Sequence, residues 1–485
     1  MLYLITISNK MELSRIGRVF VYLLVYINSR TVCGQEYSIP DVTIQALQPK
    51  GIRISIPSNP KLSLFVFQGN INRKIGENDV GTISAEITNP TNGRWSYEDL
   101  NKQLNVGDIV YYYVYVVHNR KGYIKDNLSF TVKELENLSS DSVAECSPTS
   151  TLVRNGKACA GQIIFEDNFD TLREDLWQVE QYIPDEPDYP FVSYQRPPNA
   201  AVVSTNGGYL YIQPKLLQDM PGFSNSSLFT DTLDLYSGCT ATSSKCLVEA
   251  WGASILPPIV SGRLTSKSFS FTYGVVEVRA KVPQGDWLYP DILLESLMKK
   301  YGVPNYASGV LRIAGVRGNP QLSLFNNEIG NKLLYGGPML DIQCRNTLLS
   351  EKFSNTPWGD DFHIYSARWE PERIILSVDG QEWARIEPAA SGLQGRLSRT
   401  CDLPRTLLSR GTNMAPFDDH FYITLGVAAG GITEFRDDIT SAGRPKPWRN
   451  SGRKASLRFW QDMISWYSTW RQPALIIDYV KVRAL

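Results

Sequence analysis

A succession of short apolar segments with period-two alternation constrains the fold more than any other feature of the sequence. Between Ile39 and Val132 these segments include VTIQAL, GIRISIP, KLSLFVF, TISAEI and VYYYVYVV, separated by turns rich in Gly, Pro and Asn. Alternation with a period of two places successive side chains on opposite faces of a half-buried strand. This spacing predicts a small antiparallel β-sandwich.

The same kind of pattern continues from Gln162 to Leu485, in segments such as GYLYIQP, FSFTYGVVEVRAKV and FYITLGVAAGG, and a helical period is found only near residues 457–470. So many strands with short turns predict one large double-sheet jelly roll. The stretch before it is rich in Ser, Asn, Glu and Thr and has no apolar period, which is typical of a linker. We therefore predict an all-β chain with a β-sandwich over residues 35–135, a linker over 136–160 and a jelly roll over 161–485.

Composition excludes some classes of function. Lys plus Arg equals Asp plus Glu at 49 each, and 42% of the residues are hydrophobic, so the chain is neither disordered nor strongly basic. Nucleic acid is therefore not an expected partner, and no cofactor motif is present. The chain has 11 Trp, 25 Tyr and 18 Phe, a content that suits both β cores and surfaces that stack on sugars.

The N-terminal segment is typical of a secretory signal. Arg15 and Arg18 precede an apolar run from Val19 to Ile27, and small residues end the segment at Gly34. We predict a signal peptide over residues 1–34 and a secreted protein without a membrane span, since nine apolar residues are too few to cross a bilayer. A membrane anchor is the alternative, and the start at Met1 or Met11 stays open.

Six cysteines remain after Cys33 is assigned to the signal peptide. An even number in a secreted chain predicts three disulfides, with 15 possible connectivities, of which we favour only the close pair Cys239 and Cys246. A metal site is not expected, because there is no CxxC motif and the three histidines are isolated in sequence. Sequons begin at Asn127, Asn137 and Asn225, which is compatible with a glycoprotein.

The segment VYYYVYVV poses a separate question. Alternation places Tyr111, Tyr113 and Tyr115 on one face of the strand and Tyr112 and Val114 on the other. One of these faces should belong to the core. The tyrosines on the remaining face need another explanation.

The segments IPDVTIQALQPKGIRISIP, NGRWSYEDL and LNVGDIVYYYVYVVHNRKGY resemble the N-terminal glucan-binding domain of insect β-1,3-glucan recognition proteins, carbohydrate-binding module family 39. The resemblance covers residues 37–133 and implies an immunoglobulin-like sandwich that binds β-1,3-glucan. We expect Trp95 to be exposed and to stack on sugar, while amide and guanidinium groups bond to hydroxyls; a core Trp is the alternative. The residues that carry over are Arg94, Trp95, Tyr97, Gln68, Asn70 and Asn72.

Residues 162–485 resemble the laminarinase-like members of glycoside hydrolase family 16, through segments such as FEDNFDTLREDLW, RLTSKSFSFTYGVVEVRAKVPQGDW and FHIYSARWEPERIILSVDG. This resemblance implies a concanavalin-like jelly roll. The family's active-site strand carries Glu-x-Asp-x-x-Glu directly after Ser-Gly, and a second Glu at i+5 reaches the same face only if the strand bulges. Here those positions are Val310, Arg312 and Gly315.

A retaining glycosidase needs two carboxyl groups about 5–5.5 Å apart. Val and Gly supply neither the nucleophile nor the acid/base, so we predict a domain without catalytic residues. Asp286, Asp291 and Glu295 lie nearby in sequence, but the family pattern does not place them as replacements. The resemblance leaves Trp287, Arg317 and Asn319 as candidate sugar contacts in this cleft, while the family's second aromatic, expected near Ile292 or Leu293, is missing.

These resemblances imply a secreted pattern-recognition receptor of the β-1,3-glucan recognition (Gram-negative-binding) family. It would act in haemolymph, bind microbial β-1,3-glucan, self-associate on the polymer and trigger a serine-protease cascade of the prophenoloxidase or Toll type. No cofactor is implied. Two alternatives stay open: an active secreted endo-β-1,3-glucanase, and a structural extracellular protein without a sugar ligand.

Overall fold

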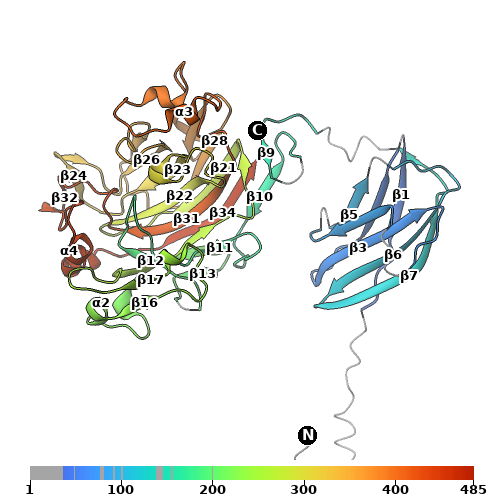
Figure 1. The fold of residues 1–485 in the computed structure, drawn as a ribbon, viewed down its shortest axis with the longest axis horizontal. Helices are drawn as coiled ribbons and strands as arrows, with labels where there is room; N and C mark the ends of the chain where they lie inside the picture. The colour runs from blue at the N-terminus through green and yellow to red at the C-terminus, as the bar shows by residue number, and fades with distance from the viewer. Residues whose placement is uncertain are drawn as a thin grey trace, which may run out of the picture. The chain divides into compact units, whose positions relative to one another are not determined.

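The structure is a computed structural model that describes residues 37–48, 50–76, 81–90, 93–99, 102–137, 146–154, 157–198 and 200–485. The predicted signal peptide, the choice between Met1 and Met11, and Cys33 lie outside these residues. Contacts divide the chain into two compact units, with the division between residues 145 and 146. Figure 1 shows strands throughout both units, and the predicted all-β fold is confirmed.

The first unit consists of two four-stranded sheets in the orders β5-β2-β1-β8 and β4-β3-β6-β7. Their inward faces share one apolar core that includes Ile54, Phe65, Phe67 and Val114. The β-sandwich is therefore confirmed, while its immunoglobulin-like assignment stays a prediction. The strands are β1 (Thr43–Gln48), β2 (Ile52–Pro57), β3 (Leu62–Ile71), β4 (Ile83–Ile87), β5 (Arg94–Asp99), β6 (Ile109–His118), β7 (Lys121–Thr131) and β8 (Glu136–Asn137).

The second unit is built on two large antiparallel sheets, in the orders β13-β14-β34-β21-β28-β29-β30 and β11-β19-β31-β22-β23-β26-β27. β10 pairs with β34, β20 pairs with β31, and β9 pairs with β20. Val276 and Val278 of one sheet and Leu294 and Leu311 of the other lie in a single core, as a double-sheet jelly roll requires. The strands of these sheets are β9 (Leu152–Val153), β10 (Ile163–Asp167), β11 (Gln178–Val179), β13 (Val203–Asn206), β14 (Tyr209–Ile212), β19 (Arg263–Thr265), β20 (Phe271–Thr272), β21 (Gly274–Lys281), β22 (Leu288–Ser296), β23 (Val310–Val316), β26 (Leu333–Met339), β27 (Ser350–Phe353), β28 (His363–Trp369), β29 (Ile374–Val378), β30 (Gln381–Ile386), β31 (Phe421–Ala429) and β34 (Leu475–Arg483).

Smaller elements complete the second unit. The helices α4 and α5 overlap residues 457–470, the only stretch for which the sequence indicated a helical period. Among the described residues, no helix has the length and apolar content needed to cross a bilayer. These elements are β12 (Val192–Tyr194), β15 (Lys215–Leu216), β16 (Thr232–Asp234), β17 (Leu247–Glu249), β18 (Ile259–Ser261), β24 (Leu322–Leu324), β25 (Asn327–Glu328), β32 (Ile439–Ser441), β33 (Arg444–Pro445), α2 (Ser227–Thr230), α3 (Arg405–Leu408), α4 (Ala455–Gln461) and α5 (Met463–Tyr467).

Two short segments of the predicted linker, residues 136–160, form strands that pair with the two units. β8 pairs with β1 of the first unit, and β9 pairs with β20 of the second. A disulfide joins Cys146 to Cys159, so the second unit begins at a covalently closed loop. Residues 138–145 lie outside the described part of the chain.

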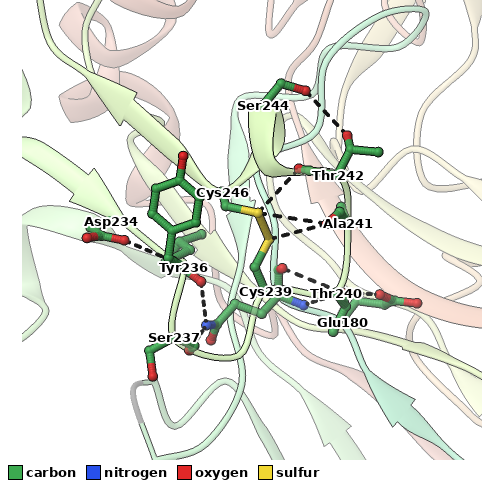
Figure 2. Close-up of a disulfide and its surroundings, with 12 residues drawn as sticks. Glu180, Asp234, Tyr236, Ser237, Cys239, Thr240, Ala241, Thr242, Ser244 and Cys246 are labelled. Atoms are coloured by element: carbon green, nitrogen blue, oxygen red, sulfur yellow. Dashed lines mark hydrogen bonds between the residues drawn. A yellow bond between two sulfur atoms is a disulfide. The ribbon is translucent and has the colours of Figure 1, made fainter.

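The prediction of three disulfides is confirmed. Cys239 pairs with Cys246, as favoured from their spacing, and Cys344 pairs with Cys401. Figure 2 shows the Cys239–Cys246 bridge at the base of a loop whose Thr240 donates to Glu180. This closed loop also fixes Lys245, whose Nζ lies 2.5 Å from Asp185 Oδ1 beside the cavity described below.

Candidate functional site

Arg94 lies on the outward face of the edge strand β5 and extends across the neighbouring strands. Its Nε donates to Ser55 Oγ of β2 (3.0 Å), and its Nη2 donates to Thr43 Oγ1 of β1 (3.0 Å). Thr43 is the register partner of Ser55, which in turn pairs with Ser96. The guanidinium group therefore lies along a row of hydroxyl side chains on the outer surface of the sandwich.

The remaining outward residues of these three strands are also polar. Arg53 and Glu98 form an ion pair with 2.7 Å between Nε and Oε2, and Gln45 Nε2 donates to Glu136 Oε2 at 2.6 Å. We call this surface the Arg94 face; it comprises Thr43, Gln45, Arg53, Ser55, Arg94, Ser96 and Glu98. It offers hydrogen-bond donors and acceptors side by side.

Trp95 does not belong to this face, and the expectation that it is exposed is wrong. Its side chain is 2% exposed and packs in the core of the sandwich. The reason is strand alternation, which places Trp95 opposite Ile56 on the inward face while Arg94 and Ser96 point outward. Tyr97 shares the inward side and is partly buried, and burial raises its pKa above the ordinary value.

The three predicted polar contacts lie on the other sheet. Gln68 Nε2 donates to Ser84 Oγ (2.7 Å), and Asn70 is 3% exposed and accepts from the backbone N–H of Thr82 (2.9 Å). Asn72 accepts from the N–H of Ile109 (2.8 Å) and so fixes a turn. The structure thus separates residues that the sequence grouped: Arg94 lies on one sheet, Gln68, Asn70 and Asn72 on the other, and Trp95 inside.

In the second unit, β23 carries the three positions at which the resemblance implies acids. The strand bulges as expected: its register with β22 and β26 shifts around Ile313 and Ala314, and both of these residues face the core. Val310, on the opposite face, packs with Leu293 and Met339 in a small apolar cluster. The surroundings of residue 310, where the resemblance implies a nucleophile, are therefore apolar.

Gly315 leaves no room for a side chain. A Cβ atom built on it would lie 2.6 Å from the ring of Tyr335 and 2.8 Å from Cδ of Arg312. Real Cβ atoms do not approach other heavy atoms this closely, and an aromatic ring cannot move aside at low cost. A side chain at residue 315 would therefore clash with Tyr335 and Arg312.

Arg312, at the third position, is 3% exposed and belongs to a buried charge cluster. Glu434 lies at its centre, with its carboxylate 2.9 Å from Arg317 Nη2, 3.2 Å from Arg345 Nη2 and 3.9 Å from Arg312 Nη2. Burial opposes ionisation of Glu434, but these guanidinium groups outweigh it and lower its pKa to about 2. The carboxylate is therefore permanently ionised and cannot donate a proton near neutral pH.

A cavity of about 300 Å³ opens above this cluster, and its lining includes the acids Asp185, Glu186, Asp188, Asp291 and Glu295. Asp291 and Glu295 come from β22. Arg263 lies between them: its Nη1 contacts Asp291, and its Nη2 is 2.8 Å from Glu295. Burial raises the pKa of Asp291. For Glu295, burial is outweighed by the combined effects of Arg263, Lys299 and the hydrogen bond from Thr424, which lower its pKa to about 2. The aromatic side chains that line the cavity are Tyr182, Tyr194, Tyr289 and Tyr306.

Comparisons with known proteins agree with this two-part arrangement. Residues 38–144 match the family model CBM39, described as a carbohydrate binding domain (family 32). The chain is 57% identical over 484 residues to a "Beta-1,3-glucan-binding protein" of Hyphantria cunea, covering 97% of this chain and 100% of that one. The chain belongs to the β-1,3-glucan-binding protein family.

More distant members of this β-1,3-glucan-binding protein family match over similar lengths. "Beta-1,3-glucan-binding protein 1" of Manduca sexta is 36% identical, with 96% of this chain and 99% of that one covered. "Gram-negative bacteria-binding protein 1" of Drosophila melanogaster is 34% identical, with 93% and 96% covered. A solved laminarinase catalytic domain from Thermotoga maritima is 17% identical over 67% of this chain and 98% of that one, with a TM-score of 0.40, too low to support a conclusion about the site.

In this chain, the three residues predicted as sugar contacts of the second unit are held by internal contacts. Trp287 is 2% exposed and packs edge-on against Phe435 and Trp448. Asn319 is fully buried and accepts from the N–H of Trp287 (3.0 Å), while Arg317 pairs with Glu434. None of the three lines the cavity, so Trp287 presents no ring face to it.

Proposed function

We propose that this protein binds β-1,3-glucan through its first unit and that its second unit has no glucanase activity. The observation that carries the proposal is the Arg94 face. It lies within the segment that matches a carbohydrate-binding family, in a chain whose relatives are named β-1,3-glucan-binding proteins.

The chemistry of this face suits a neutral polysaccharide. Sugar hydroxyl groups both donate and accept, and the face alternates guanidinium donors with hydroxyl and carboxylate acceptors. Arg94 bonds to the two hydroxyl groups of Ser55 and Thr43, contacts that sugar hydroxyls can replace at low cost. A polymer offers repeated binding sites, which allow several protein copies to bind one chain and so raise avidity.

Three features of the second unit support the absence of catalysis. Val310 belongs to an apolar cluster, Gly315 has no room for a carboxylate side chain, and Arg312 replaces the third acid. Among the acids that line the cavity, Asp291 and Glu295 are held by Arg263, Asp185 pairs with Lys245, and Asp188 pairs with Arg345. General acid–base catalysis alone is typically worth about 10²- to 10⁴-fold, so a cleft without it should hydrolyse glucan no faster than buffer.

The test combines a curdlan pull-down with a laminarin hydrolysis assay on the full chain. We expect the protein to pellet with curdlan, Arg94→Ala to bind about tenfold more weakly, and no reducing sugar to appear above a buffer blank. Arg73→Ala, which removes an exposed arginine away from this face, is the matched control. Reducing-sugar release would establish the glucanase alternative, and a folded protein that does not pellet would favour a structural role.

We also propose that the protein is secreted into haemolymph and passes glucan recognition to a serine-protease cascade. The N-terminal segment and the resemblance to recognition proteins support this role. Adding the protein and curdlan to haemolymph depleted of it should restore phenoloxidase activation, and Arg94→Ala should restore less. If the parent and the Arg94→Ala variant activated phenoloxidase equally, activation of the cascade would not depend on the Arg94 face.

A further inference from the structure

An irregular segment of the second unit concentrates positive charge. Residues 393–411, between β30 and β31, contain four arginines and a single acid, Asp402, so four positive charges less one negative charge give a net charge of +3. Figure 1 shows the short helix α3 of this segment, in orange, at the periphery of the second unit. We call this segment the arginine lobe; its arginines are Arg396, Arg399, Arg405 and Arg410.

Buried anchors hold the arginine lobe in place. Leu393, Leu397 and Cys401 belong to the main core of the second unit, and a disulfide joins Cys401 to Cys344. Leu408, on α3, is 2% exposed. Because such anchors recur along the segment, the arginines extend from a backbone that the core holds in one conformation.

Backbone carbonyl groups gather the arginines into a small region. Arg405 donates through Nη1 to the carbonyl oxygen of Gln394 (3.2 Å) and through Nη2 to that of Ser398 (2.7 Å). Its guanidinium group therefore lies beside the stretch of backbone that carries Arg396 and Arg399. One side chain thus links the first half of the lobe to α3.

The positive charge of the arginine lobe is not neutralised within the described part of the chain. There, none of its four arginines forms an ion pair, and the side chains of Arg396 and Arg405 donate to backbone carbonyl oxygens. By contrast, Arg317 and Arg345 of the same unit pair with Glu434. A guanidinium group has five N–H donors, so one or two carbonyl contacts orient it and leave donors for a further acceptor.

An exposed apolar side chain accompanies these charges. Leu407 is 42% exposed and lies between Arg405 and Arg410 in sequence. Arginine is enriched at protein–protein interfaces, where its planar fork binds carboxylates in a bidentate manner. An acidic polypeptide supplies carboxylates and apolar side chains within a few residues, whereas a sulfated or phosphorylated polymer supplies the charge without apolar side chains. The combination therefore favours a protein as the partner.

We propose that the arginine lobe is a docking surface for an acidic segment of a partner protein. Carboxylates of that segment bind the guanidinium groups, and one of its apolar side chains packs on Leu407. The inference goes beyond glucan binding, because the lobe belongs to the second unit and does not depend on the Arg94 face. It gives the second unit a role that needs no glucanase activity.

The experiment measures peptide binding to the full-length protein by fluorescence anisotropy at pH 7 and low salt, where charge contacts are least screened. The probe is a labelled peptide with repeats of Glu-Glu-Leu. We expect Arg399→Gln/Arg410→Gln to bind it about tenfold more weakly than the parent, because two charge contacts are lost. The matched control is Arg449→Gln/Arg453→Gln, which removes two exposed arginines of the same unit outside the lobe and should bind as the parent does.

A second variant separates a protein partner from an anionic polymer. Leu407→Ala should bind the Glu-Glu-Leu peptide about fivefold more weakly and leave binding of a Glu-Glu-Ser peptide unchanged, because it removes only an apolar contact. If dextran sulfate binds more tightly than either peptide and Leu407→Ala has no effect, the lobe is a site for an anionic polymer and the inference is overturned.

The remaining outcomes also decide the matter. If the parent binds neither peptide, or if the arginine double variant keeps the parent's affinity with its fold confirmed by circular dichroism, the lobe is not a docking surface. An equal loss in the control would show binding to positive charge in general and would also overturn the inference. Every variant should pellet with curdlan as the parent does, since glucan binding is proposed for the first unit. A parent that does not pellet would overturn the proposed function and leave the peptide result standing.

Discussion

The outer faces of the first unit and the cavity of the second use polar side chains in opposite ways. On the Arg94 face, the arginine bonds to the hydroxyl groups of Ser55 and Thr43 and lies at the surface. In the cavity, Arg263 joins two carboxylates, and in the buried cluster beneath it Glu434 is surrounded by three guanidinium groups. A ligand can replace hydroxyl contacts at low cost, but separating buried ion pairs leaves uncompensated charge. Polar character alone therefore does not identify a binding site.

The largest expected effect comes from breaking the buried cluster. Glu434→Gln leaves Arg312, Arg317 and Arg345 without their carboxylate, and we expect the second unit to lose about 3–5 kcal/mol of stability at pH 7. Thermal unfolding followed by Trp fluorescence measures this loss. Glu382→Gln, at an exposed pair with Arg385, is the control and should leave the unfolding midpoint almost unchanged.

The same cluster has a pH signature. The pKa of Glu434 is lowered to about 2, so its stabilisation is present above the ordinary carboxyl pKa and disappears as the pH falls from about 4.5 towards 2. Glu434→Gln should therefore unfold with a shallower pH dependence in that window. Curdlan binding by this variant at pH 7 should be unchanged, because the Glu434 cluster belongs to the second unit. If the folded variant lost curdlan binding, the proposed assignment of glucan binding to the first unit alone would be contradicted.

A smaller effect of opposite sign is expected at Asp286. Burial raises its pKa to about 6, so the folded protein is favoured while the group is protonated, and stability declines as the pH rises from about 4 to 6. Asp286→Asn removes the buried charge and should stabilise the second unit by about 2 kcal/mol at pH 7, with little change at pH 4. Melting temperatures at both pH values decide this; equal shifts at pH 4 and 7 would show that the carboxylate is not the cause.

Replacement of Trp95 tests whether this residue packs in the core of the first unit or contacts sugar. Trp95→Phe retains an aromatic core residue and removes an indole N–H that has no hydrogen-bond partner among the described residues. We expect a change of about 1 kcal/mol or less and unaltered curdlan binding. Trp95→Ala should instead cost about 3–5 kcal/mol through the cavity it creates, so loss of binding in that variant would not identify a sugar contact. Weaker curdlan binding by a stable Trp95→Phe would contradict the buried role.

Restoring acids to the cleft should have the smallest effect on activity. Val310→Glu/Gly315→Glu recreates the two glutamates in sequence, but Tyr335 and Arg312 occupy the space at residue 315. We expect no laminarin hydrolysis above a buffer blank. Reducing-sugar production by this variant would show that the cleft adapts more readily than its packing indicates.

The sequence predicted structural features correctly where each feature depends on a single short segment of the chain. Alternation along VYYYVYVV predicted which side chains share a face, and the spacing of Cys239 and Cys246 predicted their disulfide. The signal for Trp95 was also local: in GRWSYED the polar Arg94 and Ser96 alternate with Trp95 and Tyr97, which indicates a buried aromatic pair. Following the Gly-containing turn instead led to the wrong expectation of exposure.

The grouping of residues from different strands could not be predicted in this way. Whether Gln68 lies beside Arg94 or on the opposite sheet depends on strand order, and so does the pairing of Arg263 with Asp291 and Glu295. Thr43 and Ser55 were missed for the same reason, because only the register of β1, β2 and β5 places them under Arg94. Pairing between distant strands is a property of the whole fold that local periodicity does not encode.

The packing around Gly315 also limits how this sequence can change over evolutionary time. Any single replacement at residue 315 forces a side chain into Tyr335, so the replacement is harmful until Tyr335 has first become smaller. Loss of Tyr335 in turn removes a hydrogen-bond partner of Glu434 (2.6 Å) before any catalytic benefit exists. A glutamate at residue 315 therefore requires at least one further change, and each of these changes is unfavourable when made alone.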